Sequence, residues 1–123
     1  MPPPAPAAER PAASTAERDE AAIRRLVATY ARAIETKNLA QFRTIKPNLS
    51  AAEERRLQDG FRAVTSQQVE MNILSIARNG DEATVAVRRR DTIQAGGRQQ
   101  SSESRQTMTV ARQGENWIIV DIR

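Results

Sequence analysis

The order of hydrophobic and polar positions divides the chain into a helical first half and an alternating second half. From Ile23 to Ile34, apolar residues recur at the three- and four-residue spacing of an amphipathic helix, opposite a face of Arg and Glu. Ser14 and Glu17 match a capping box, so we expect this helix to begin at Ser14 and to run to about Thr36. Its apolar stripe needs another layer to lie on.

Two shorter helices are expected before the pattern changes. Asn38 can end the first helix and cap a short second one, which Pro47 terminates. Ser50 and Glu53 form a second capping box, which opens a third helix with apolar residues one turn apart, among them Leu57. All three helices are amphipathic, so we expect them to cover one side of a sheet.

After Ser66 the apolar residues alternate with polar ones, which is typical of β-strands. Glycine-containing turns at Asn79-Gly80, Gly96-Gly97 and Gly114-Glu115 separate four such segments. The strands are expected at residues 67–78, 82–94, 99–112 and 116–123. The chain therefore predicts an α+β fold in which three N-terminal helices pack on one curved antiparallel sheet.

The turn lengths also predict which residues face one another across the sheet. A two-residue loop at Gly96-Gly97 pairs Val85 with Met108 and Ala83 with Val110. The apolar residues of both strands then share one face, whereas a slip of one residue would separate them.

The first hairpin needs an irregularity to keep its apolar residues on that face. The Asn79-Gly80 turn, expected as a type I′ turn, pairs Ile76 with Ala83. Nearer the start of the strand the apolar residues fall out of phase. A bulge near Asn72 or Ile73 would bring them back to the same face and would bend the strand.

Composition limits the chemistry available to the chain. Its 123 residues, 39% of them hydrophobic, suit one small domain. The absence of Cys excludes disulfides, thiolate metal sites and Cys nucleophiles, and the absence of His removes the usual general base. We expect no metal site and no cofactor.

The positive charge does not predict a nucleic-acid partner. The net charge is +4, but acidic residues are interleaved with the arginines throughout. The basic run Arg88-Arg89-Arg90 alternates across a predicted strand and so forms no dense patch.

The N-terminal segment differs in composition from the remainder. Residues 1–13 hold five of the six prolines, which favours a Pro/Ala-rich disordered tether ahead of a domain over residues 14–123. An ordinary frayed terminus is the alternative. We find neither a signal peptide nor a membrane span, so a cytoplasmic location is the default expectation.

The last strand is apolar on both faces. Trp117 and Ile119 point one way, and Ile118, Val120 and Ile122 point the other. In an open sheet with helices on a single side, one of these faces would meet water. We therefore expect Ile118, Val120 and Ile122 to form a homodimer contact. The alternative is that the sheet curls until both faces are partly covered.

Polar residues continue the predicted core face of the two middle strands. Arg89 and Asp91 follow the apolar positions there, and the register sets Ser104 opposite Arg89. A desolvated Arg–Asp pair beside hydroxyls and an amide could orient a polar or anionic small molecule. The candidate ligand pocket comprises Tyr30, Arg89, Asp91, Ser104, Gln106 and Trp117. Alternatively, the hairpin overhangs the helices with its polar residues solvated, and Tyr30 is a core tyrosine.

A family resemblance rests on four stretches, which are residues 23–33, 37–42, 75–85 and 116–119. With their order of helices and strands they resemble the nuclear-transport-factor-2-like superfamily, a cystatin-like α+β cone that polyketide-cyclase-like proteins and ketosteroid isomerases share. The resemblance implies the fold more than the function, because enzymes, ligand binders, association domains and adaptors all use it.

The chain departs from the enzymes of that superfamily at one important position. They typically place a carboxylate base soon after the first helix, where this chain has Lys37 and Asn38. An amide cannot abstract a proton at neutral pH, so we assign no catalytic residue. We expect a non-catalytic small-ligand-binding or association module, and the resemblance implies an accessory domain of a larger bacterial signalling protein. The alternatives are a small cyclase, isomerase or hydrolase using Tyr30, Asp91 and Arg89, and an adaptor that binds protein through the outer sheet face.

Overall fold

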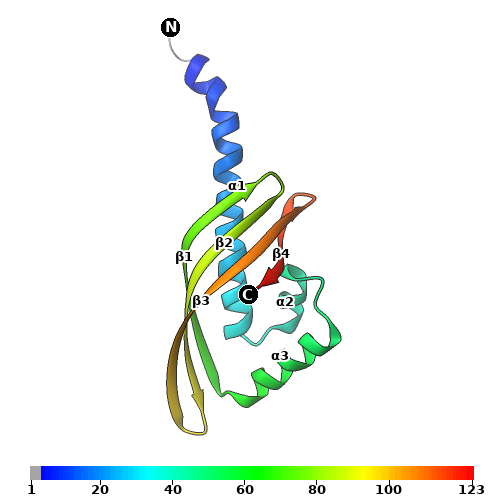
Figure 1. The fold of residues 1–123 in the computed structure, drawn as a ribbon, viewed down its shortest axis with the longest axis vertical. Coiled ribbons are helices and arrows are strands. Elements are labelled where there is room, and N and C mark those ends of the chain that lie inside the picture. The colour runs from blue at the N-terminus through cyan, green and yellow to red at the C-terminus, as the bar shows by residue number, and fades with distance from the viewer. Residues whose placement is uncertain (1–3) are drawn as a thin grey trace.

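Three helices precede four strands in the structure, a computed structural model that describes the backbone of residues 4–123 and side chains from residue 16 onward (Figure 1). The elements are α1 (Pro4–Glu35), α2 (Leu39–Ile45), α3 (Ala51–Ala63), β1 (Ser66–Asn79), β2 (Glu82–Ala95), β3 (Arg98–Gln113) and β4 (Asn116–Ile122). The predicted α+β fold is thus confirmed, with strand limits that differ by one residue at most. Within this part of the chain no helix combines the length and the apolar character that a membrane crossing requires.

Helix α1 is longer than the sequence analysis predicts. It begins at Pro4 rather than at Ser14, and it includes residues 4–13, which were expected to be disordered. Alanine has the highest helix propensity of all residues and is frequent in this segment, and Pro4 and Pro6 lie in the first turn, where proline is tolerated; neither reason accounts for Pro11, which lies farther inside the helix. That propensity outweighs the Ser14 capping signal. The use of residues 1–13 as a tether stays a prediction.

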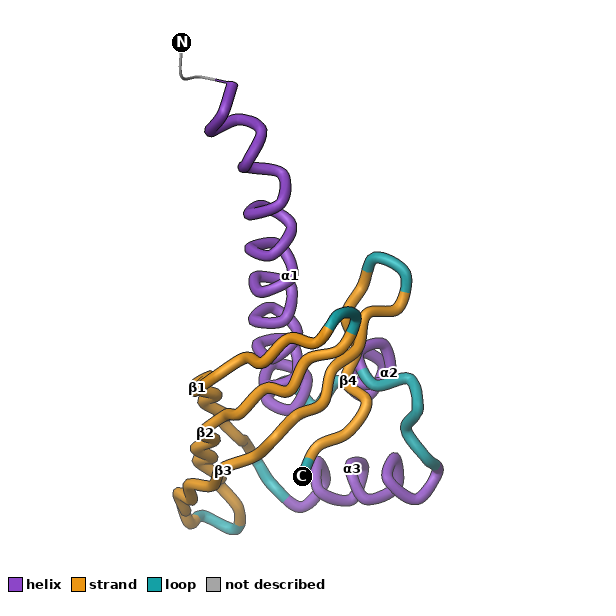
Figure 2. The backbone as a smooth tube through the Cα atoms, turned by 45° about the horizontal axis from the view of Figure 1, so that its top comes forward, coloured by secondary structure: helices purple, strands orange, loops and turns teal. Residues whose placement is uncertain are grey.

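The four strands form one antiparallel sheet in the order β1-β2-β3-β4. The sheet bends along its length, and α1 lies across one of its faces, where it packs on β1 and β4 (Figures 1 and 2). Helix α2 contacts α1 and β4, and α3 continues from it around the end of α1. The helices and the bent sheet together make a cone.

The predicted pairing of the two middle strands is confirmed. Val85 lies opposite Met108 and Ala83 lies opposite Val110. All four are buried, in one core with Tyr30 of α1. The loop residues Gly96 and Gly97 both have positive φ, as a two-residue hairpin of this kind requires.

The first hairpin turns one residue later than predicted. The loop is Gly80-Asp81, and of the two only Gly80 has a positive φ, so the expected type I′ turn is wrong. Ile76 consequently pairs with Val85 instead of Ala83. The apolar face survives because the pairing shifts by two residues, which preserves the side-chain alternation.

A bulge in β1 restores the phase as predicted. It lies between Ile73 and Ser75, next to the expected positions, and it leaves Leu74 unpaired and half exposed. Beyond it Ile73 faces Val87 and Met71 faces Arg89. The whole inner face of β1 is therefore turned toward α1.

A second bulge, which the sequence analysis missed, changes the assignment of the last strand. Trp117 and Ile119 are buried in the core. The register then shifts at Val120, so that Ile122 pairs with Met108 and packs against the core. Ile122 therefore does not share the outer face with Ile118 and Val120, and the predicted three-residue contact surface is reduced to two residues.

The narrow end of the cone is closed by an ion cluster around a buried carboxylate. Asp19 of α1 is 8% exposed and accepts a hydrogen bond from Arg78 of β1 at 2.6 Å. Arg112 of β3 donates to the same oxygen and lies over the Trp117 ring, 5.2 Å from its centroid. These contacts fasten α1 to two strands and satisfy the buried charge.

Candidate functional site

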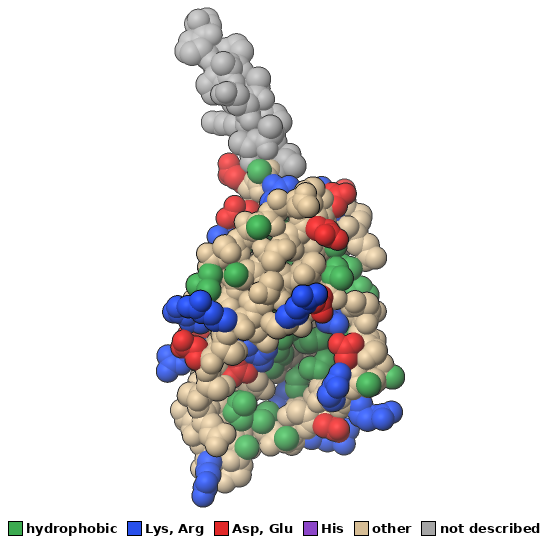
Figure 3. Space-filling model, viewed as in Figure 1, with side chains coloured by type: hydrophobic (Ala, Val, Ile, Leu, Met, Phe, Trp, Pro, Cys, Tyr) green, Lys and Arg blue, Asp and Glu red, His purple; other side chains and the backbone are tan. Residues whose placement is uncertain are grey.

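A pocket of about 500 Å³ opens at the wide end of the cone, between the sheet, α2 and α3. In Figure 3 it is the hollow whose wall shows hydrophobic side chains. Its larger aliphatic and phenylalanine lining residues are Ile34, Phe42, Leu49, Leu57, Phe61, Val64, Ile93 and Ile122. A ligand with a mainly apolar body therefore fits this space.

Polar contacts set the corner between the helices that frame the pocket. Lys37 ends α1 in the left-handed conformation, with φ 54°, and its Nζ donates to the carbonyl of Val64 at 2.6 Å. Asn38 caps α2 through the backbone of Gln41. Ser50 opens α3 with the predicted capping box. The two predicted helix starts are thus confirmed, and together they place α3 over the pocket.

One polar cluster lies on the sheet wall of the pocket. Arg89 donates to both oxygens of Asp91, at 2.7 Å and 2.9 Å, and its Nη1 donates to the Tyr30 hydroxyl at 2.9 Å. Gln67 of β1 donates to Asp91 at 2.9 Å. The side chains of Arg89 and Asp91 are only 15% and 13% exposed, so this geometry is held in a desolvated setting.

Burial sets the protonation of the hydroxyl in this cluster. Desolvation raises the pKa of Tyr30, although the charge of Arg89 acts in the opposite direction. Burial also lowers the pKa of Arg89, but the bond to Asp91 and the contact with Tyr30 outweigh it and the net shift is upward. At neutral pH the hydroxyl keeps its proton. Because its oxygen already accepts from Arg89, the hydroxyl can donate to an incoming acceptor.

A second polar pair lies across the pocket, on the helical side. Lys46 is 7% exposed, and its Nζ donates to Glu53 at 3.3 Å. The pKa of Glu53 is lowered, first by the backbone N–H of Ser50 and then by its side chain and Lys46. Arg56 adds a further cation to the lining. Sequence reasoning missed this wall because Lys46 and Arg56 carry no pattern beyond an exposed helical charge.

The structure brings together half of the candidate pocket residues. Tyr30, Arg89 and Asp91 form one cluster, as expected. Ser104 is exposed on the overhanging part of the hairpin and does not line the pocket. Its prediction as a ligand contact is therefore not supported by its place in the structure.

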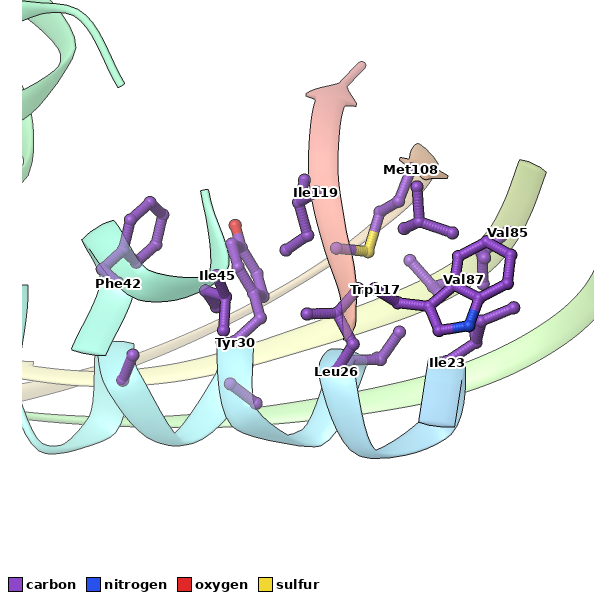
Figure 4. Close-up of a cluster of buried hydrophobic side chains, with 14 of the residues drawn as sticks. Ile23, Leu26, Tyr30, Phe42, Ile45, Val85, Val87, Met108, Trp117 and Ile119 are labelled. Atoms are coloured by element: carbon purple, nitrogen blue, oxygen red, sulfur yellow. The ribbon is translucent and has the colours of Figure 1, made fainter. Parts of the chain in front are cut away.

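The other two candidates lie in the core layer. Trp117 is 6% exposed, and Figure 4 shows it beside Ile23 at the opposite end of the buried cluster from Tyr30. Gln106 is partly buried, and its Oε1 has no hydrogen-bond partner among the described residues. Neither residue lines the pocket. Their inward orientation was predicted correctly, but their distance along the cone was not.

Glu53 and Asp121 line the pocket, whereas Asp91 lies behind Arg89 and does not, and all three carboxylates accept hydrogen bonds from neighbouring groups. Both oxygens of Asp91 accept hydrogen bonds, Glu53 bonds Lys46 and the Ser50 backbone, and Asp121 bonds Arg123 at 2.9 Å. In the part of the chain whose side chains are described, no three acidic residues are placed to hold a metal ion. The arrangement suits recognition of an oxygen acceptor on a ligand better than proton abstraction.

Comparison with known proteins identifies the fold. No family model matches the chain, and no curated protein matches it by sequence. A protein from Kribbella flavida matches in structure with a TM-score of 0.80 at 15% identity, over 88% of this chain and 90% of its own. An NTF2-like protein with a cystatin-like fold from Novosphingobium aromaticivorans matches with a TM-score of 0.79 at 17% identity, over 91% and 84%.

A third solved structure is a candidate dehydratase of the NTF2-like family from Streptomyces avermitilis. It matches with a TM-score of 0.78 at 12% identity, over 87% of this chain and 95% of its own. Identities this low speak for the fold alone. The chain has the NTF2-like fold, the cystatin-like α+β cone that the sequence analysis expected.

Proposed function

We propose that the chain is a non-catalytic binding module that takes a small, largely apolar ligand into the wide end of the cone. The ligand presents a carbonyl, carboxylate or similar oxygen to Tyr30 and Arg89. The observation behind the proposal is the joint geometry of these two side chains. Asp91 orients the guanidinium, the guanidinium binds the hydroxyl, and the hydroxyl proton is left to donate.

The rest of the pocket supports an apolar ligand body. Phe42 packs against Tyr30 with ring centroids 5.5 Å apart, and Phe61 and Leu57 of α3 face them across the opening. A few polar groups that fix orientation within an otherwise apolar lining are typical of small-molecule sites.

An enzyme acting through Tyr30, Arg89 and Asp91 is the competing function, and the same cluster is its starting point. It would resemble the candidate dehydratase in fold. A general base must reach a substrate proton, however, and Arg89 and Gln67 already occupy both oxygens of Asp91. We therefore favour binding without turnover.

The experiment titrates the protein with 8-anilinonaphthalene-1-sulfonate, an aromatic anion whose fluorescence rises in apolar surroundings. We expect saturable binding to the native protein, because the pocket combines an apolar lining with cations. Tyr30→Phe deletes one donor and should weaken binding roughly two- to tenfold, as the loss of one hydrogen bond does. Ser104→Ala deletes an exposed hydroxyl outside the pocket and should leave binding unchanged. Equal affinities for the two variants would refute the assigned site.

We also propose that the module associates as a homodimer through its outer sheet face. Alternation places Thr84 opposite Thr109 and Ala86 opposite Thr107 on this face, so the part near β4 and the first hairpin turn is small and uncharged, whereas Arg88 faces Arg105 farther along the strands. Ile118 lies beside it, and Val120 is 38% exposed. A face of this kind can pack on a copy of itself. A ligand pocket combined with a dimer surface on the outer sheet face would suit an accessory domain of a larger signalling protein.

Sedimentation velocity tests the dimer. Val120→Asp places a charge on the outer face and should convert a dimer to a monomer without unfolding it. Leu74→Asp, at an apolar position of the β1 bulge that is 47% exposed, is the control and should leave the mass unchanged. A monomeric unmodified protein would disprove the dimer, whatever the variants do.

A further inference from the structure

A second groove lies between α1 and the free edge of the sheet, away from the pocket of the cone. It has a volume of about 770 Å³. Its floor is apolar, with Val27 and Ala31 of α1 facing Val69, Met71 and Ile73 of β1. Its helical rim holds three arginines, Arg24, Arg25 and Arg32.

The strand along this groove is an open edge. β1 is the first strand in the sheet order and has a neighbour on one side only (Figure 1). The backbone N–H of Val69 points away from β2, because it donates to the Glu35 carboxylate of α1 at 2.9 Å. In an antiparallel strand the outward direction recurs every second residue, so Met71 and Ile73 also present their backbone groups to the groove. Such an edge is a template for a further strand.

The positive charges around the groove favour an added strand that carries acidic side chains. Arg24 bonds Glu20, whereas Arg25 and Arg32 are exposed and form no ion pair with any residue whose side chain the structure describes. Glu35 already shows an acidic group satisfying one edge N–H. A second copy of the chain would bring its own three arginines to the same place, and like charges disfavour that pairing.

The dimensions of the groove match a short peptide. The rim from Arg24 to Glu35 spans about 16 Å at the rise of an α-helix. The edge from Val69 to Ile73 spans about 13 Å, the length of four to five extended residues. The bulge at Leu74 interrupts regular pairing at one end, and Glu35 occupies the other.

We propose that this groove binds an extended acidic peptide of a partner protein as an additional strand beside β1. Its backbone pairs with Met71 and Ile73, and its carboxylates face Arg25 and Arg32 of α1. This interaction is independent of the small-ligand pocket, because no residue lines both.

The first test is fluorescence anisotropy with a fluorescein-labelled octapeptide of alternating glutamate and valine. We expect saturable binding to the intact chain and none for the lysine–valine counterpart. The double variant Arg25→Glu/Arg32→Glu should weaken binding roughly tenfold or more, because it reverses both charges that face the peptide. The control Arg55→Glu/Arg62→Glu makes the same change of net charge on α3 and should bind as the unmodified protein does. Equal binding of both peptides, or equal weakening in both variants, would overturn the proposal.

Amide hydrogen exchange supplies the second test, which reports the strand pairing itself. Saturating peptide should slow exchange at Met71 and Ile73 roughly tenfold or more, with no change at the free edge of β4. Binding without protection of β1 would show that charge attraction alone captures the peptide. Protection of these amides in the free protein, together with a dimeric mass, would show that a second copy fills the groove. Either result would refute the proposal.

Discussion

The narrow and wide ends of the cone use the same sheet face in opposite ways. At the narrow end Val85, Met108 and Val110 are fully buried beneath α1. Toward the wide end the same face of β2 continues into Arg89 and Asp91, and the space in front of the guanidinium is hollow. One end is filled with aliphatic side chains, and the other is lined by a fixed polar cluster.

The difference separates stability from recognition along one strand pair. The filled end removes the most apolar surface from water, so it supplies most of the folding free energy. Helix α3 at the hollow end has no fully buried residue, so substitutions in it should reduce the free energy of unfolding less. Substitutions should therefore divide according to the end of the cone at which they lie.

Met108→Ala should give the largest loss of stability. The side chain is 0% exposed at the centre of the filled end, and truncation leaves a cavity there. We expect the free energy of unfolding to fall by about 2–5 kcal/mol in urea titrations. Leu74→Ala, at a position 47% exposed, should change it by about 0.5 kcal/mol or less. Similar losses in the two variants would contradict the contrast between buried and exposed positions.

Asp19→Ala should have the next largest effect. It leaves two guanidinium groups without their shared partner, and both are about a third exposed, with 32% for Arg78 and 30% for Arg112. Partial solvation limits the loss to about 1–3 kcal/mol in the same urea titration. Glu20→Ala breaks an exposed pair with Arg24 and should cost about 0.5 kcal/mol or less. Dye binding at the wide end should be unaffected in both variants.

Ser50→Ala should destabilise α3 without unfolding the cone. It removes the capping bond to the Glu53 backbone, which is worth about 1 kcal/mol to a helix. Amide exchange should accelerate in α3 and stay slow in the middle strands. Uniform acceleration throughout the chain would show that α3 is part of the same cooperative unit as the core.

Because of the same cap, the stability of α3 should depend on pH. The folded-state pKa of Glu53 is lowered from its usual 4.5, chiefly by the Ser50 backbone N–H. Its contribution is therefore complete above about pH 4.5 and is lost as the pH falls through the lower folded-state value. Relative to the intrinsic exchange rate at each pH, the protection of α3 amides should fall with acid in the unmodified protein and depend less on pH in Glu53→Gln.

The smallest expected effect is the loss of stability when the Tyr30 hydroxyl ionises at high pH. It leaves stability at neutral pH unchanged. Burial raises its pKa above the usual 10.0, so the contribution of the neutral hydroxyl is complete below that pH and is lost as the pH rises through the folded-state value. The chain has a single tyrosine, so ultraviolet titration of the phenolate reports this residue directly. Ionisation at the usual value would show that Tyr30 is solvated rather than buried against Arg89.

The sequence predicts the sheet well because glycine turns fix register over long strands. Two positive-φ residues at Gly96 and Gly97 leave one way to close the hairpin, and the pairing of Val85 with Met108 follows. At Asn79, Gly80 and Asp81 either of two adjacent pairs can form a short turn, and the structure uses the later one. Because side chains alternate along a strand, the apolar face of β1 was predicted correctly although the partner of Ile76 was not.

The pocket was only half predictable, because half of it comes from helices whose position the sequence does not fix. Arg89 and Asp91 follow from strand alternation, and Tyr30 follows from the helical stripe. Lys46 and Glu53 meet across the α2–α3 corner, and Lys37 bonds the Val64 carbonyl at the other end of α3, so both contacts join residues that no local pattern brings together. Trp117 was assigned to the correct face, but a face does not tell how far along the cone a residue lies.

The bulge at Val120 divides the last strand into two parts whose side-chain alternation is out of phase. Ile119 and Ile122 both point inward only because one extra residue stands between them and the regular ladder. Deleting Val120 would leave Ile119, Asp121 and Ile122 with the partners they already have, so the ladder would become regular and Ile122 would still face the pocket. A strand that kept all its residues but lost the bulge would instead turn Ile122 outward and Asp121 inward, which changes the cavity mouth while the core up to Ile119 stays the same.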